Sequence, residues 1–129
     1  MIAPKWLLVK TIRAIHEMQL ARHGGAMGLR DEQQLMTVLR APQDLSEQQP
    51  ETPVHTLAAA YVAGMVKAKP FLDANKRTGL VAGATFLYEN GWLLKADQPD
   101  AVIATLRLAS GEWTDEQFTL WLQQHSAQI

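Results

Sequence analysis

The sequence predicts an all-α fold, a compact single-domain bundle of about six helices over residues 1–129. Three observations carry this prediction. Apolar residues recur at spacings of three and four in successive segments. Capping residues, glycines and prolines stand between those segments. No segment shows the sustained apolar–polar alternation that indicates a strand.

The first helix is expected from about residue 7 to residue 22, where Leu8, Ile12 and Ile15 share one face. The glycines at positions 24 and 25 end it, because a helix end favours a residue with positive φ. The second helix begins after Asp31, which forms a capping box with Gln34. Its apolar stripe is Leu35, Val38 and Leu39. We expect Pro42 to end it and residues 42–53 to form a loop.

The third helix is expected to begin near Pro53, with Leu57, Tyr61 and Met65 facing the core. The small residues beside this stripe would let another helix approach closely, which favours a central position; they are Ala58, Ala59, Ala60, Ala63 and Gly64. The fourth helix is expected over residues 73–89. Its inward residues would be Leu80, Ala84 and Leu87, and Asn90-Gly91 would close it.

Residues 92–94 are short and apolar and are interpreted as an extended segment. Pro99 opens the fifth helix, whose apolar residues are Val102, Ile103 and Leu106, and Ser110-Gly111 ends it. A capping box of Thr114 and Gln117 opens the sixth helix. Its inward residues are expected to be Phe118, Trp121 and Leu122.

Composition excludes several classes of function. The chain has no cysteine, which excludes thiol catalysis and cysteine-bound zinc and fits a reducing, cytoplasmic location. A net charge of −1 gives no general attraction to nucleic acid or to acidic membranes. No apolar run approaches the roughly 20 residues that span a bilayer. The N-terminal residues lack the pattern of a signal peptide. We therefore expect no direct nucleic-acid partner and no membrane partner.

Chemistry concentrates in residues 67–78, where four cations surround a single acid. Pro70 ends one helix, and Asp73 to Asn75 open the next, whose N-terminus would offer free backbone N–H groups to phosphate. Lys76 and Arg77 are unfavourable in a first helical turn unless an anion is bound there. Helix-forming rules also allow a plainer interpretation, in which Asp73 is only an N-cap and the residues after it are solvated. Under either interpretation Phe71 is a buried anchor for the loop.

This segment resembles the Doc branch of the Fic/Doc family. The Doc form of the family motif reads H-x-F-x-[DN]-A-N-K-R, and residues 69–77 read K-P-F-L-D-A-N-K-R. Six of its seven defined positions match, and the remaining one, the histidine, is Lys69. Further matching residues extend over nearly the whole chain; they are Trp6, Ile15-His16-Glu17, His23-Gly24-Gly25, Gly28-Leu29-Arg30-Asp31, Ala58 to Ala60, Thr85-Phe86-Leu87, Asn90-Gly91 and Ser110-Gly111-Glu112.

The resemblance implies a toxin of a toxin–antitoxin module with the Fic/Doc fold. It implies a kinase that transfers the γ-phosphate of ATP or another nucleoside triphosphate to a threonine of elongation factor Tu, which stops translation. The implied partner is an antitoxin whose C-terminal helical segment lies in a groove of the toxin.

The resemblance also implies roles for single residues. Asp73 would position the nucleophile or Mg²⁺ through the phosphates, and Asn75 with neighbouring amides would form an anion hole. Lys76 and Arg77 would bind the nucleotide phosphates, with Lys67 as a further cation. A lysine at position 76 is associated with a reversed nucleotide that presents its γ-phosphate, which favours phosphoryl transfer over the nucleotidyl transfer of Fic enzymes.

Lys69 stands where the family has its general base. Histidine suits that role at pH 7, whereas lysines ordinarily titrate near about 10.4 and act as bases only where their surroundings lower that value strongly. Three interpretations stay open: an inactivating substitution in a toxic protein, a natural binding module with little catalysis, or a working lysine. The alternatives to a weakened kinase are therefore a non-catalytic antitoxin- or nucleotide-binding module, or a Fic-type nucleotidyltransferase.

The four histidines show no short metal-ligand spacing, and His16 is expected to be structural. Arg30 and Asp31 are expected to fix a turn and the start of a helix.

Overall fold

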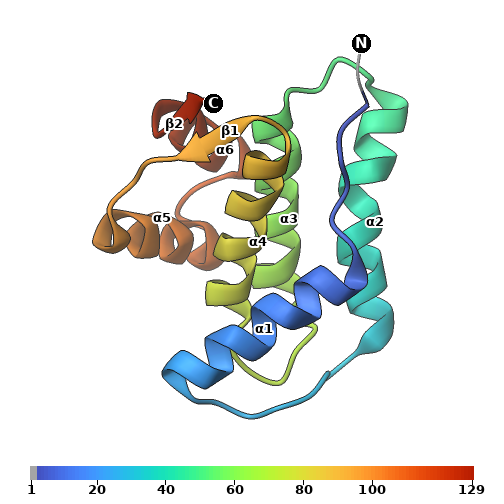
Figure 1. Cartoon of the computed structure of the whole chain (residues 1–129), viewed down its shortest axis with the longest axis vertical. Helices are drawn as coiled ribbons and strands as arrows, with labels where there is room; N and C mark the ends of the chain where they lie inside the picture. The colour runs from blue at the N-terminus through green and yellow to red at the C-terminus, as the bar shows by residue number, and fades with distance from the viewer. Residues whose placement is uncertain (1–2) are drawn as a thin grey trace.

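The central element of the structure is helix α3 (Val54–Ala68), as Figure 1 shows. The computed structural model describes residues 3–129. Three α3 residues that the sequence placed inward, Leu57, Tyr61 and Met65, are completely buried. Helix α3 contacts α2 (Glu32–Gln48), α4 (Asn75–Glu89), α5 (Gln98–Ser110) and α6 (Asp115–Gln124). The predicted central position of this helix is confirmed.

Helices α3 and α4 approach each other so closely that α4 needs glycine at two positions. A Cβ atom on Gly83 would lie 2.5 Å from Cγ2 of Val62, and one on Gly79 would lie 2.9 Å from Cβ of Met65. The sequence attributed the close approach to small residues of α3, but the glycines of α4 are needed as well. This packing fixes the start of α4 beside the end of α3.

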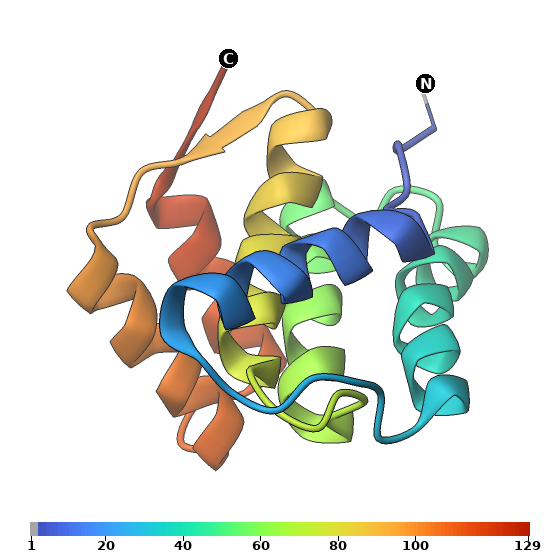
Figure 2. The ribbon, with the colours of Figure 1, turned by 60° about the horizontal axis from the view of Figure 1, so that its bottom comes forward.

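Helix α1 (Val9–His23) crosses over α3 and α4, as Figure 2 shows. Ile12 and Ile15 are buried as expected, but Leu8 is 56% exposed. The expected apolar stripe was wrong at Leu8, because this residue is extended and precedes the helix. Leu7 is buried in its place, and its N–H donates to the hydroxyl of Tyr61 at 3.3 Å. Gly24, with φ of 76°, ends the helix as predicted.

The prediction that Pro42 ends the second helix was wrong. Helix α2 continues to Gln48 with Pro42 inside it, so the expected loop over residues 42–53 shrinks to a short connection. A proline inside a helix removes one backbone hydrogen bond. Here Pro42 is buried and Leu45 packs against the core. Burial of apolar surface on both sides of the proline offsets that loss.

Two capping boxes were predicted, and one of them forms completely. At the start of α6, the Thr114 hydroxyl accepts from Gln117 N, and the Gln117 side chain accepts from Thr114 N. At the start of α2, the Asp31 side chain accepts from Gln34 N as expected. The Asp31 N–H, however, donates to the carbonyl oxygen of Pro70 at 3.0 Å. In the capping box at the start of α2, this tertiary hydrogen bond thus takes the place of the one that the Gln34 side chain would have accepted.

The prediction for the inward face of α5 was wrong. Val102, Ile103 and Leu106 are 45%, 47% and 48% exposed. The residues of α5 that are buried are Ala101, Ala104, Thr105 and Leu108. The start of α5 after Asp97 and its end at Gly111 agree with the prediction. In α4, Leu87 is buried as expected, whereas Leu80 and Ala84 are half-buried at the edge of the core.

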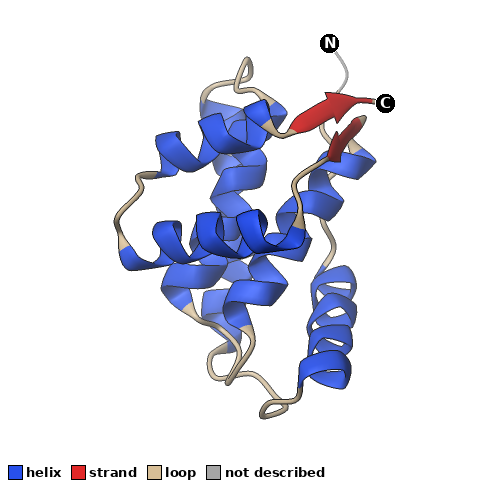
Figure 3. Ribbon diagram, turned by 90° about the vertical axis from the view of Figure 1, so that its left-hand side faces the viewer, coloured by secondary structure: helices blue, strands red, loops and turns tan. Residues whose placement is uncertain are grey.

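Two short strands pair at the end of the bundle opposite the start of α4, as Figures 1 and 3 show. Strand β1 (Trp92–Leu94) confirms the extended segment and pairs antiparallel with β2 (Ser126–Gln128), which the sequence did not predict. The six helices dominate residues 3–129, so the all-α prediction is confirmed. Among these residues no helix is long and apolar enough to cross a membrane.

Candidate functional site

The candidate site is the loop of residues 69–74, between the end of α3 and the start of α4. Pro70 disfavours helical geometry at the residue before it, and Lys69 adopts the left-handed conformation with φ of 50°. Ala74, the N-cap of α4, is also left-handed, with φ of 63°. These are the two non-glycine residues with positive φ within residues 3–129. Such a conformation costs about 1–3 kcal/mol and persists only where the surroundings impose it.

Asn75 fastens the loop from inside. Its Oδ1 accepts from Phe71 N at 3.0 Å, and its Nδ2 donates to Phe71 O at 3.0 Å. The Phe71 ring itself is buried, with 3% of its surface exposed. The side-chain amide of Asn75 is therefore hydrogen-bonded to the loop backbone, and the second N–H of its Nδ2 stays free for a ligand.

The segment between α1 and α2 fastens the loop from outside, and Figure 2 shows the two stretches side by side. Leu29 and Phe71 form an antiparallel bridge, flanked by hydrogen bonds from Arg30 N to Pro70 O at 2.7 Å and from Leu72 N to Gly28 O at 3.1 Å. The loop thus forms part of a small backbone ladder, although it lies in no regular sheet.

Two side chains outside the loop hold its ends. The Arg30 guanidinium donates to the carbonyl oxygens of Ala68 and Lys69. His16, from α1, donates from Nε2 to the carbonyl oxygen of Asp73 at 3.0 Å and stacks on the Phe71 ring. The sequence treated both residues as structural and gave neither a partner. Both residues are among those that carry the family resemblance, and this was the one signal in the sequence that pointed to a role at the site.

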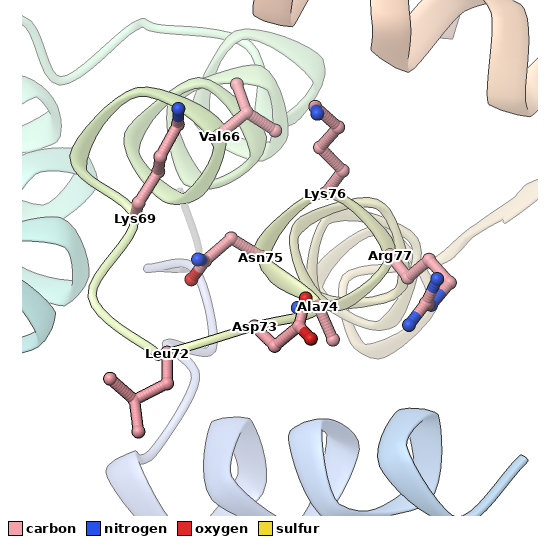
Figure 4. Close-up of a pocket in the computed structure, with 8 residues that line it drawn as sticks. All are labelled: Val66, Lys69, Leu72, Asp73, Ala74, Asn75, Lys76 and Arg77. Atoms are coloured by element: carbon pink, nitrogen blue, oxygen red, sulfur yellow. The ribbon is translucent and has the colours of Figure 1, made fainter. Parts of the chain in front are cut away.

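The loop and the first turn of α4 enclose a cavity of about 290 Å³, shown in Figure 4. The polar side chains that line it are Lys69, Asp73, Asn75, Lys76 and Arg77. In Figure 4, Lys69 and Lys76 extend to the same side of the loop, Asn75 lies between them, and Leu72 points away. Three cations and one acid line this cavity, which therefore favours an anion.

The backbone at the start of α4 adds donors to this cavity. The first helical hydrogen bond of α4 runs from Thr78 N to Ala74 O at 3.0 Å. The amides of Asn75, Lys76 and Arg77 precede that bond, so they have no partner within the helix. Free amides, the positive end of a helix dipole and nearby cations together bind phosphate groups well.

Asp73 carries the negative charge of the site. Its Oδ1 accepts from Ala74 N at 2.9 Å, and its Oδ2 accepts from Ala26 N at 3.4 Å. These two hydrogen bonds lower the pKa of the exposed Asp73 carboxyl below its ordinary value, and the charges of Arg77 and His16 add to the effect. The carboxylate is therefore charged at neutral pH, and each oxygen keeps lone-pair capacity for a cation.

A magnesium ion could use Asp73 as its single protein carboxylate. Within residues 3–129 no three histidine or acidic side chains gather in a metal-binding cluster. Mg²⁺ bound together with a nucleotide needs no such cluster, because it takes one or two carboxylates and completes its coordination with phosphate oxygens and water. The residues present fit that mode of binding.

Lys67 is separated from the other candidate residues. Its ammonium forms an ion pair with Asp115 at 2.7 Å, at the exposed junction of α3 and α6. Lys67 does not line the cavity. The structure brings together five of the predicted polar residues and directs this one elsewhere.

Comparison with known proteins places the loop within a region that matches a protein family. The model of the Fic/DOC family matches residues 6–87, which is more than half of the chain and includes the whole loop. The chain is also 29% identical over 99 residues to the protein kinase Doc of Escherichia phage P1. That alignment covers 77% of this chain and 78% of the phage protein. The chain therefore belongs to the Fic/DOC family, in the Doc branch.

Proposed function

We propose that this chain is a Doc-type toxin whose site transfers the γ-phosphate of a nucleoside triphosphate to a threonine of elongation factor Tu, and that Lys69 weakens the reaction. The observation that carries the proposal is the cationic cavity, which Lys69, Lys76 and Arg77 line at the open N-terminus of α4. The phage P1 relative, described as a protein kinase, supports phosphoryl transfer in particular.

Each residue of the loop and of the first turn of α4 would have its own role in phosphoryl transfer. The amides of Asn75 and its neighbours would hold the oxygens of the transferred phosphoryl group. Arg77 would grip a second phosphate in a bidentate manner, and Lys76 would act as a point charge. Phosphoryl transfer depends mainly on such positioning and on charge stabilisation, and this cavity has both.

Asp73 would hold Mg²⁺ against the nucleotide phosphates, because its carboxylate is charged and lines the cavity. When bound, the ion supplies charge neutralisation for the phosphoryl group. The hydrogen bonds from Ala74 and Ala26 would keep the Asp73 carboxylate in one orientation.

An adjoining groove offers room for the rest of the nucleotide. It has a volume of about 340 Å³, lies between α4 and α5, and shares Lys76 and Arg77 with the phosphate cavity. Leu80, Val102 and Leu106 make its lining largely apolar, which suits a base and a ribose. The exposure of the two α5 residues, which the sequence had placed in the core, fits this role.

The target hydroxyl would lack an efficient base. Lys69 stands at the position of the family's histidine, and its side chain is exposed on the loop. A general base typically contributes about 10²- to 10⁴-fold to rate, and we expect this chain to be weaker by about that factor than a form with histidine at position 69.

A second function stays open because of the same exposed lysine. The chain would then be a non-catalytic module that binds nucleotide or antitoxin. In either function we expect a cognate antitoxin as partner and the cytoplasm as the location. Nucleotidyl transfer of the Fic type is less favoured, because Lys76 occupies the position where Fic enzymes leave room for an α-phosphate.

The deciding experiment is the intact mass of elongation factor Tu after incubation with Mg²⁺, ATP and either the parent chain or its Lys69→His variant. A phosphate-sized gain with the variant, and little with the parent, supports a kinase weakened at its base. An equal gain with both means that Lys69 works. A nucleotide-sized gain shows nucleotidyl transfer. No gain with either, together with measurable ATP binding, favours the binding module. Asp73→Asn in the Lys69→His background serves as the inactive control.

A further inference from the structure

His16 is a buried titratable residue that the proposed chemistry does not use, and it contacts the loop through Phe71 and Asp73. Its side chain lies in α1, 57 positions before Asp73, and only 4% of its surface is exposed. The imidazole stacks on the Phe71 ring, with centroids 3.8 Å apart and planes inclined by 11°. Its Nε2 lies 3.0 Å from the carbonyl oxygen of Asp73. A carbonyl oxygen only accepts, so Nε2 carries the hydrogen.

This hydrogen bond holds the carbonyl oxygen of the Asp73–Ala74 peptide on the side of His16. A trans peptide is planar, and its C=O and N–H point in opposite directions. With the Asp73 carbonyl oxygen held toward His16, the Ala74 N–H points to the other side of the loop, where it donates to Asp73 Oδ1 at 2.9 Å. Asp73 and Ala74 both line the phosphate cavity.

The opposite orientation would harm the site. If the peptide turned over, the carbonyl oxygen would face the cavity and its partial negative charge would repel a phosphate. The turned peptide would also lose the hydrogen bond from Ala74 N to Asp73 Oδ1, which orients the Asp73 carboxylate. Ala74 has positive φ without being a glycine, so its own preference does not maintain the observed orientation. An outside contact must hold it.

We infer that His16 is a positioning residue for phosphate binding: it fixes the Asp73–Ala74 peptide so that its N–H side, and not its carbonyl oxygen, faces the cavity. That the ligand is a phosphate rests on the proposed function, whereas the peptide orientation follows from the hydrogen bonds alone. His16 acts through Asp73 and Ala74 and does not itself line the cavity.

The test compares three variants of the full chain. His16→Phe keeps the ring stack on Phe71 but removes the donor, and His16→Gln keeps a donor but removes the ring. His55→Phe is the matched control, because His55 is another buried histidine, 6% exposed, whose Nε2 lies 2.9 Å from the Ser126 hydroxyl oxygen outside the site. Thermal unfolding confirms that each variant folds.

Two readouts follow. Binding of inorganic phosphate and of Mg²⁺–ATP is measured by NMR titration, and peptide orientation by the NOE between Hα of Asp73 and the amide proton of Ala74. We expect His16→Phe to weaken both affinities by about tenfold, the value of one hydrogen bond, and to change the NOE. His16→Gln should recover most of the affinity. His55→Phe should lower the unfolding temperature but leave both readouts as in the parent.

Parent-like affinity and NOE in His16→Phe would overturn the inference. So would equal losses of affinity in His16→Phe and His55→Phe, because His16 would then act only through stability. If the parent binds neither phosphate nor ATP, the proposed function fails. The NOE in His16→Phe still decides whether His16 sets the peptide orientation.

Discussion

The guanidinium of Arg30 donates from Nε to the carbonyl oxygen of Lys69 at 2.7 Å, across 39 positions of the chain. The same guanidinium reaches the carbonyl oxygen of Ala68. The C-terminus of α3 is thus completed by a residue from the segment between α1 and α2. The main chain at Lys69 is held by a contact distant in sequence.

Arg30→Gln should therefore loosen the loop. A hydrogen bond from a charged donor is worth about 1.5–3 kcal/mol, but Arg30 is exposed, so we expect the free energy of unfolding to fall by only about 1 kcal/mol. Urea unfolding measures the change. Arg40→Gln is the control, because Arg40 forms only an exposed ion pair within α2, and it should cost about 0.5 kcal/mol or less. Equal effects of the two variants would mean that the Arg30 contacts contribute nothing specific.

Replacing Lys69 by glycine should stabilise the protein. Lys69 has φ of 50°, a conformation that costs a residue with a Cβ about 1–3 kcal/mol and glycine almost nothing. We expect Lys69→Gly to raise the free energy of unfolding by about 0.5–1 kcal/mol. Lys67→Gly, two residues earlier and inside α3, should lower it by about 1 kcal/mol, because glycine is unfavourable in a helix. Urea unfolding of both variants compares the signs, and a loss of stability in both would contradict the left-handed conformation at Lys69.

Replacing Gly83 by alanine should destabilise the protein, although alanine favours helices. The new Cβ would lie 2.5 Å from Cγ2 of Val62 and 3.4 Å from the carbonyl oxygen of Ala58, so α3 and α4 would have to separate. Overpacking of this kind costs about 1–3 kcal/mol. Calorimetric unfolding should show the loss, and Val62→Ala should cost less stability in the Gly83→Ala chain than in the parent, because it relieves the clash there. If the losses of the two single variants simply add in the double variant, Val62 is not the source of the clash.

Stability should fall in mild acid because of His55. Burial lowers the pKa of the His55 imidazole below its ordinary value of 6.5, so the folded protein resists protonation there. As pH falls below about 6.5 the unfolded chain binds a proton that the folded chain does not, and stability declines by at most about 1.4 kcal/mol per pH unit. The decline stops once the pH passes below the lowered folded-state pKa.

The measurement is urea unfolding between pH 5 and 7. His55→Gln should flatten the pH dependence over this range. Thr105→Val alters a buried residue without a titratable group and should shift the curve equally at every pH. A slope unchanged by His55→Gln would assign the pH dependence to another group.

The candidate site was predictable because its residues are consecutive. The run Phe71 to Arg77 carries the family resemblance and a helix start within one short segment, and the structure gathers its polar side chains around one cavity. Lys67 lay equally close in sequence, but its ammonium pairs with Asp115 of α6. Proximity in sequence could not show that competing partner, because the partner comes from another helix.

The sequence by itself determined the six helices, most of their ends and the cationic loop. Spacing and capping are local properties, and each is satisfied within one or two turns. The tertiary structure alone decided that α2 passes through Pro42, that α5 turns Val102, Ile103 and Leu106 outward, and that His16 and Arg30 hold the two ends of the loop. Those outcomes depend on surface buried and donors satisfied between segments distant in the chain, and such energies exist only once the helices have packed.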